Sequence, residues 1–234
     1  MSVFDRLLKA LGKEDSDVQP ETPHDGSEAR PATDPVSVWA SAQGYVASAT
    51  PADDGLTLAG KVGDKDWLLT RGPSSRDFIE GEELHARAAL GVASDASVVI
   101  MSRPLKEDLE KQAYAIYTDS LQTTVNTSLP EEMRWLAMYE EVVWDGLASE
   151  FLERYAVLAD DLEHAVAWLE SGLVDSLMHW PDAQTARQAP FMLMTMRGNV
   201  YMRMEYLPAD LPTLQHAVAV LNLGCESALK NLAG

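Results

Sequence analysis

The sequence predicts an α+β fold, in which a mostly antiparallel sheet packs against helices. Three patterns indicate this class. Short segments of alternating apolar residues fill the first part of the body, Gly198-Asn199 separates two apolar segments as a hairpin turn would, and a long helical pattern follows Asp210. Because the strands and helices come in separate runs and not in strict alternation, the pattern favours α+β over α/β.

Residues 2–11 predict a short amphipathic helix that begins after Ser2 and ends at Gly12. Its apolar face consists of Phe4, Leu7, Leu8 and Leu11. A helix this short is marginal in water unless its apolar face is buried. We therefore expect this face to bind a partner protein, and the alternative is that it packs on the body of its own chain. Any contact with a membrane is expected through these residues alone.

Residues 13–36 predict a disordered linker. They hold four prolines and seven acidic residues but only two basic ones, so they have little apolar surface to bury. The expected organisation is thus a helix in residues 1–12, a linker in 13–36 and a folded body in 37–234. The body is open to division into two similar halves, 37–128 and 129–234.

The body begins with a short helix over residues 37–44, and alternating apolar residues then predict four strands. These strands cover residues 56–62, 66–71, 84–90 and 97–102. From Leu105 the apolar period becomes helical.

Residues 131–146 fit a strand or a helix, and we interpret Met133–Met138 as a strand. The second part of the body then repeats the two kinds of pattern. It predicts a strand at 154–158, a helix capped by Asp160-Asp161 that breaks near Gly172, a hairpin of 191–197 with 200–206, and a final helix with apolar positions from Leu214 to Leu232.

The segment from Glu150 to Tyr206 carries a resemblance. Its Glu150-Phe151-x-x-x-Tyr155-x-Val157 pattern, the spaced leucines that follow Asp161 and the hairpin at Gly198-Asn199 resemble a family of uncharacterised bacterial proteins, a domain of unknown function. The resemblance implies an antiparallel α+β module and supplies no functional residues.

The composition argues against several functions. Lys plus Arg number 18 and Asp plus Glu number 37, so the net charge is −19, which repels phosphate backbones and argues against nucleic-acid binding. The lone Cys225 excludes an internal disulfide and a cysteine-rich zinc site. No apolar run is long enough to cross a membrane and no signal-peptide pattern opens the chain, so we expect a cytoplasmic protein.

One polar loop is the most site-like feature of the body. Arg71, Ser74, Ser75 and Arg76 lie in or beside a Gly-Pro-Ser-Ser loop, and Arg87 follows on the next strand. Guanidinium and hydroxyl groups bind carboxylate or phosphate through charge-assisted hydrogen bonds, so these five residues are candidate ligand-binding residues. The alternative is that the arginines pair with acids of the same chain.

The methionines and histidines carry weaker signals. Met192, Met194 and Met196 alternate along one predicted strand, with Met202 and Met204 on its partner. Thioethers at this spacing bind Cu(I), form adaptable binding surfaces or fill a core, and we expect core. No histidine has the spacing of a zinc site and no catalytic motif is present, so we predict no metal, no cofactor and no catalytic residue.

These observations favour a non-catalytic cytoplasmic interaction or adaptor protein, which binds a protein partner through the tethered helix and the α+β body. The alternative is a binder of, or an enzyme on, a small anionic ligand in an arginine-lined cleft near residues 71–87.

Overall fold

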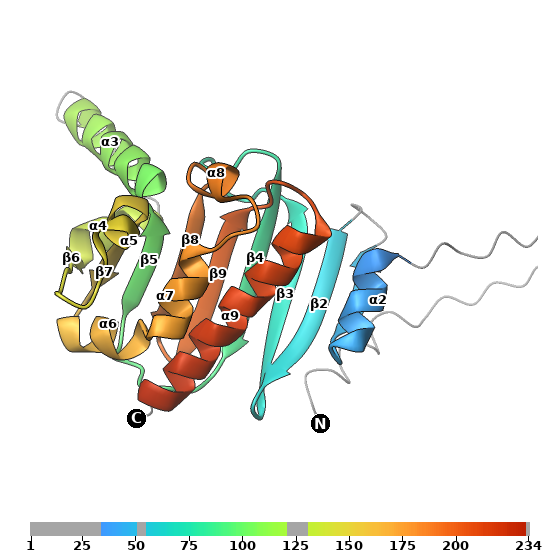
Figure 1. Cartoon of the computed structure of the whole chain (residues 1–234). Helices are drawn as coiled ribbons and strands as arrows, with labels where there is room; N and C mark the ends of the chain where they lie inside the picture. Colours follow the sequence, from blue (N-terminus) through green and yellow to red (C-terminus); the bar gives the residue numbers. More distant parts are fainter. Residues whose placement is uncertain (1–33, 51–54, 121–130, 233–234) are drawn as a thin grey trace, which may run out of the picture. The chain divides into compact units, whose positions relative to one another are not determined.

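The computed structural model describes residues 34–50, 55–120 and 131–232, which hold eight helices and nine strands (Figure 1). The predicted helix of residues 2–11 and nearly all of the predicted linker lie outside the described residues. The elements are α2 (Pro35–Ala42), β1 (Val46–Thr50), β2 (Gly55–Val62), β3 (Lys65–Pro73), β4 (Glu82–Ala89), β5 (Val98–Ser102), α3 (Arg103–Ser120), α4 (Glu131–Met138), β6 (Glu140–Glu141), α5 (Ser149–Arg154), β7 (Tyr155–Ala159), α6 (Leu162–Trp168), α7 (Ser171–Met178), α8 (Ala183–Ala186), β8 (Phe191–Met196), β9 (Asn199–Glu205) and α9 (Leu211–Asn231).

The nine strands form a single sheet in the order β1-β2-β3-β4-β9-β8-β5-β7-β6, and every neighbouring pair is antiparallel. The predicted α+β class with a mostly antiparallel sheet is therefore confirmed. Strand β5 lies between β7 and β8, so residues 37–128 and 129–234 contribute to one interleaved sheet and not to two separate layers.

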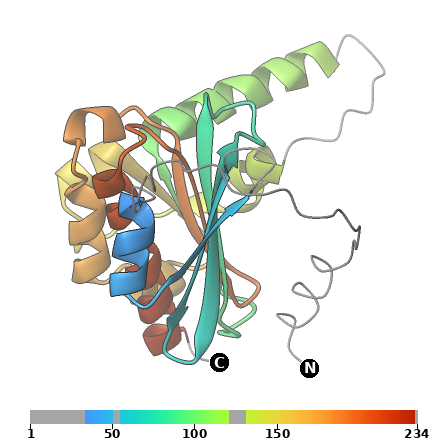
Figure 2. The ribbon, with the colours of Figure 1, turned by 90° about the vertical axis from the view of Figure 1, so that its right-hand side faces the viewer.

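Helices lie on both sides of this sheet, but unequally (Figure 2). The first face packs against α2, α6, α7 and α9. Its apolar core extends from β2 to β7 and includes Leu58, Leu69 and Leu193. The second face packs against α3 and α4, which cover its β5, β7 and β8 region. Among the described residues, no helix is both long and apolar enough to span a membrane.

The long helix α9 is fixed to the first face by a close approach to α6. Trp168 Nε1 donates to the carbonyl of Gly224 at 2.8 Å, and Ser227 Oγ donates to the carbonyl of Trp168 at 2.6 Å. A side chain at position 224 would meet Leu193 at 3.3 Å, so glycine lets the helix backbone approach the sheet closely. Asp210 caps the helix by accepting a hydrogen bond from Thr213 N, as the sequence predicts.

Aromatic rings fill the first face near β1. Tyr45 packs edge-on against Trp67 and against Trp39 of α2, with ring centroids 5.0 and 5.7 Å apart. Gly60 lies opposite Trp67 in the strand register. A Cβ at position 60 would meet the Trp67 ring at 2.3 Å, so the ring occupies the space that a side chain there would need.

The second face has its own apolar cluster, which is rich in methionine. Met192, Met194 and Met196 of β8 pack there with Met101, Met133 and Trp135. Met202 and Met204 belong instead to the core of the first face, so the five methionines of the hairpin do not share one face. The expectation that they fill the core is confirmed, since all five are buried.

Three predictions about local structure were wrong. Met133–Met138 lies in α4 and is not a strand, because the buried residues of this segment, Glu132, Met133 and Trp135, do not alternate as those of a half-buried strand would. The hairpin loop is Arg197-Gly198, since Asn199 pairs with Met196 inside the ladder. The linker was drawn too long, because Pro35 and Val36 belong to α2 and Asp34 caps that helix.

Candidate functional site

The described part of the second face is hollowed where α4 stops covering the sheet. A hollow of about 210 Å³, called here the second-face hollow, lies between β4, β9, the β8–β9 turn and α4. It is lined by Arg76, His85, Glu131, Glu132, Trp135, Met194, Met196, Arg197, Tyr201, Met202 and Arg203. An adjoining hollow of about 240 Å³ shares Glu131, Trp135, Met196 and Arg197 with it.

Strand alternation explains which side chains face this hollow. On β4, Leu84 and Ala86 point into the first-face core, so His85 and Arg87 point to the second face. On β9, Tyr201 and Arg203 do the same. The register pairs His85 with Arg203 and Arg87 with Tyr201, and the Arg87 guanidinium lies 5.7 Å from the centre of the Tyr201 ring.

A buried carboxylate anchors the floor of the site. Glu83 is only 4 % exposed, and Arg203 Nη1 lies 2.5 Å from its Oε1. Its Oε2 accepts hydrogen bonds from Ser75 N and Ser75 Oγ at 2.8 and 3.1 Å, and Arg203 also donates to Ser75 Oγ. A charge this deeply buried is tolerated because each partner is itself hydrogen-bonded.

A second ion pair joins α4 to the loop that follows β3. Arg76 Nε lies 2.5 Å from Glu132 Oε1, and Glu132 is only 3 % exposed. Met133 and Trp135 of the same helix pack into the methionine-rich cluster. The polar loop and α4 therefore form one wall of the hollow, held by an ion pair on one side and by apolar packing on the other.

The arginines create a positive environment around His85. Desolvation lowers the pKa of His85 most, and the charges of Arg203, Arg76 and Arg87 lower it further against the opposing effect of Glu83. Desolvation also lowers the pKa of Arg203. An anion that enters the hollow would meet these cations at close range, where the local dielectric strengthens the attraction.

Two further arginines at the hollows have no ion pair with a described residue. Arg197 lies at the β8–β9 turn and lines both hollows, while Arg134 of α4 lines the adjoining one. Both are exposed. They bring guanidinium groups next to the apolar surfaces of Trp135 and Met196, which is the combination that binds a carboxylate attached to an apolar group.

The structure does not bring the five predicted ligand-binding residues together. Arg71 lies on the Trp67 and Leu69 side of β3, with its Nε 3.5 Å from Glu82 Oε1, whereas Arg87 lies on the second face. Ser74 Oγ donates to the carbonyl of Arg76 at 2.7 Å. Of the predicted set, Arg76 alone lines the second-face hollow, and Ser75 contacts its floor through Arg203.

Several residues that shape the site were not predicted from the sequence, among them Trp135, Arg197, Tyr201 and Arg203. Their positions depend on β4 pairing with β9, which joins segments that are far apart in the chain. One local signal was available. Alternation along β9 places Tyr201 and Arg203 on one face of the strand, opposite its methionines.

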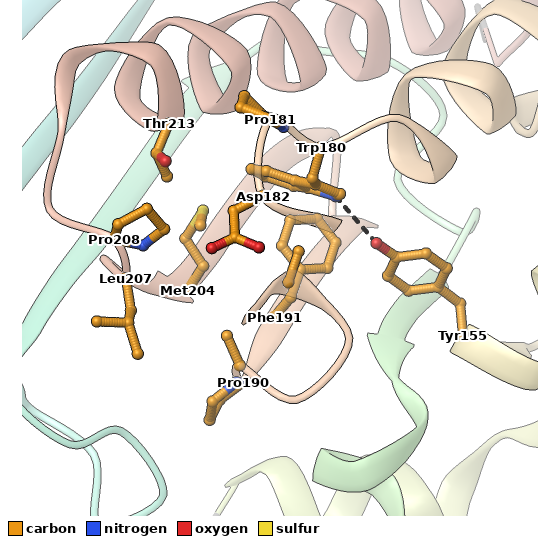
Figure 3. A pocket seen from close by; sticks show the side chains of 12 residues that line it. Tyr155, Trp180, Pro181, Asp182, Pro190, Phe191, Met204, Leu207, Pro208 and Thr213 are labelled. Atoms are coloured by element: carbon orange, nitrogen blue, oxygen red, sulfur yellow. Dashed lines mark hydrogen bonds between the residues drawn. The ribbon is translucent and has the colours of Figure 1, made fainter. Parts of the chain in front are cut away.

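A further pocket is lined by residues of β7, α8, β8, β9 and α9 (Figure 3) and has too little free space for a ligand. Its free space of about 10 Å³ holds at most one water molecule. Trp180 Nε1 donates to Tyr155 Oη at 3.0 Å, and Tyr155 Oη donates to the carbonyl of Leu177 at 2.9 Å. Asp182 caps α8 by accepting from Gln184 N and Thr185 N. The polar side chains Tyr155, Trp180 and Asp182 of this pocket are therefore already hydrogen-bonded within the protein.

Metal and thiol chemistry find little support in the described part of the chain. No three His, Cys, Asp or Glu residues within it converge as metal ligands would. Cys225 is fully buried, and burial raises the pKa of its thiol to about 12, so the reactive thiolate is suppressed at neutral pH.

No protein-family model, curated protein or solved structure matches this chain. The resemblance of residues 150–206 to a family of uncharacterised bacterial proteins therefore stays a prediction.

Proposed function

We propose that this protein is a non-catalytic interaction protein that binds an acidic segment of a partner protein on the second face of its sheet. The observation that carries the proposal is the position of five arginines. Although the chain has a net charge of −19, Arg76, Arg87, Arg134, Arg197 and Arg203 line or adjoin the two hollows. In so acidic a protein, this grouping favours a ligand that carries negative charge.

The shape of the surface favours a polypeptide segment. The two hollows adjoin, and beyond Tyr201 and Arg87 the surface continues over strands β3 and β2. There Leu68 is 46 % exposed, and the exposed Lys61 forms an ion pair with Asp66 at 3.1 Å. An extended segment with alternating acidic and apolar side chains could lie along this surface. Met138 of α4, which lines the adjoining hollow and is 67 % exposed, supplies flexible apolar surface that adapts to different partners.

The arrangement of charges supports binding over catalysis. The buried Glu83 and Glu132 are each paired with an arginine, so these carboxylates hold the site together. Glu131 also lines both hollows, beside the guanidinium groups. We keep the expected contribution of Phe4, Leu7, Leu8 and Leu11 as a second contact with a protein partner. A cytoplasmic location remains part of this proposal, in keeping with the acidic composition and the lone cysteine.

The second candidate is a small anionic ligand bound in the second-face hollow alone. The volume of this hollow is about 210 Å³, and because ligand pockets usually span about 300–1,000 Å³, it would hold only a small ligand. Such a ligand would be held by Arg76, Arg197 and Arg203. It would not contact Arg87, which lies outside the lining of the hollow.

Binding of defined peptides to the full chain tests the proposal. The probe is a labelled extended peptide in which Glu alternates with Val, and the matched peptide carries Gln in place of Glu. We expect the Glu peptide alone to bind, with chemical-shift changes at β4 and β9, and we expect Arg87→Glu to weaken it about 10-fold or more. Arg187→Glu is the matched control, because Arg187 is an exposed arginine at the C-terminal end of α8.

Equal binding of the two peptides, or equal losses in the two variants, would contradict the proposal. Binding that depends on Arg203 but not on Arg87 would favour the small-ligand alternative. A parallel measurement on a chain that begins at Thr33 tests the first 32 residues while it keeps the Asp34 cap of α2 intact.

A further inference from the structure

The β8–β9 turn places an arginine in a conformation that arginine rarely adopts. Met196 pairs with Asn199, so Arg197 and Gly198 form a two-residue loop with φ angles of 52° and 74°. Positive φ at both loop positions defines a type I′ turn, in which Asn-Gly is strongly preferred. Arg197 is the only non-glycine residue with positive φ in the described part of the chain, and its backbone is strained relative to Asn or Gly at this position.

The surrounding backbone holds this turn in place. The carbonyl of Gly198 accepts hydrogen bonds from Leu90 N at 3.2 Å and from Gly91 N at 2.7 Å. A Cβ on Gly198 would meet the carbonyl oxygen of Val92 at 3.0 Å, so the segment after β4 crosses directly against the tip of the turn. Because these contacts fix the turn through residue 198, the arginine at 197 is not needed to form it.

The backbone conformation of Arg197 is unfavourable, but it places the side chain at the two hollows. The side chain lines both hollows, is exposed, and forms no ion pair with a described residue. In the adjoining hollow it is accompanied by Arg134 of α4 and by the apolar surfaces of Trp135 and Met196. Residues held in unfavourable backbone conformations cluster at functional sites.

We propose that Arg197 is a ligand-binding residue whose strained position at the turn presents its guanidinium to a carboxylate of the acidic partner segment. The neighbouring apolar side chain of that segment then packs on Trp135 and Met196, and Arg134 binds the next acidic group. The inference rests on the proposed function, because it assigns the residue that recognises charge at the same site.

The test measures binding and thermal stability of the full chain together. In Arg197→Asn, the new residue suits the turn, so we expect a higher melting temperature than in the wild type. The same variant should bind the Glu-Val peptide about 10-fold or more weakly, as expected when a charge-assisted hydrogen bond to a carboxylate is lost. Arg197→Gly should behave alike, and Arg197→Lys should keep part of the affinity. Arg187→Asn is the control and should bind the peptide as the wild type does.

The possible outcomes separate the two proposals. If the wild type binds the Glu peptide and Arg197→Asn binds it equally well, the role of Arg197 is refuted while the proposed function stands. If Arg197→Asn loses stability and affinity together, Arg197 acts through the fold, and its assignment as a binding residue is wrong. If the wild type binds neither peptide, the proposed function fails and the assignment of Arg197 fails with it.

Discussion

The two faces of the sheet are covered by helices to different extents. The first face is covered along its length by helices, and its core is almost entirely apolar, with Trp168 and Leu193 fully buried at its centre. The second face is covered over β5, β7 and β8 by α3 and α4. Where that cover ends, buried Glu83 and Glu132 pair with arginines and two hollows open.

This difference indicates which face of the sheet offers a surface for binding. A continuous apolar core stabilises the fold through burial, whereas ion pairs at a half-covered face contribute little net stability but fix the positions of charged groups. We infer that the first face determines the stability of the fold and that the second face determines what it binds.

The comparison predicts its largest effect for a pair of tryptophans. Trp168→Ala should lower the free energy of unfolding by about 3–5 kcal/mol, because it leaves a cavity under α9 and removes the hydrogen bond to Gly224. Trp135→Ala on α4 should lower it by only about 1–3 kcal/mol, yet weaken peptide binding. Urea unfolding measures both. A larger loss of stability in Trp135→Ala would reverse the roles of the two faces.

A smaller effect is expected for two glutamates that face each other across β4 and β9. Glu83→Gln should lower the free energy of unfolding by about 3 kcal/mol, since it leaves buried Arg203 without its carboxylate partner. Burial and the charge of Glu80 raise the pKa of Glu205, so its charged form is disfavoured in the fold. Glu205→Gln should therefore leave stability within about 0.5 kcal/mol of the wild type, or raise it. Equal losses in the two variants would show that Glu83 is not an anchor.

The smallest effect is a loss of stability at acidic pH, and one histidine on each face is expected to contribute to it. Desolvation first, and neighbouring charges second, lower the pKa of His85 below its ordinary value of 6.5, and desolvation is the largest cause of the lowered pKa of His216. The unfolded chain therefore takes up protons at these groups at a higher pH than the folded chain does. Stability is complete above about pH 6.5 and declines as the pH falls toward the pKa values of the folded state. Chemical unfolding between pH 7.5 and 5 measures this slope, which His85→Gln or His216→Gln should reduce; an unchanged slope in both variants would contradict the expectation.

Most of the first face could be predicted from the sequence, and much of the second could not. Strands β2 to β5 and helix α9 follow from local apolar periods, because a residue buried on one face repeats every two or every three to four positions. Helix α4 did not, because it buries Glu132 beside Met133 and Trp135, and the charged residue obscures the helical pattern. The acid that breaks the apolar pattern is the one that pairs with Arg76.

The candidate site was less accessible to sequence reasoning for a topological reason. The loop around Ser75 and Arg76 was identified, but the partners of its side chains lie far away along the chain. Arg203 of β9 donates a hydrogen bond to Ser75, and Glu132 of α4 forms an ion pair with Arg76. Residues Arg71 and Arg87 sit on adjacent strands, and their separation onto opposite faces follows from the strand register. Only the pairing of β4 with β9 brings His85, Arg203 and Tyr201 together.

The central claim is that the second face recognises negative charge, and the ionisation of two histidines tests it most directly. His85 faces the arginines of the second-face hollow. His216 packs against Trp180 on the other side of the sheet, and its Nε2 hydrogen-bonds to the carbonyl of Ser176. Both rings can be titrated by NMR in the full chain, without and with a saturating amount of the Glu-Val peptide. Our account predicts that the peptide raises the pKa of His85 and leaves that of His216 unchanged. A bound peptide that leaves the pKa of His85 unchanged, or that shifts the pKa values of both histidines alike, would contradict this account.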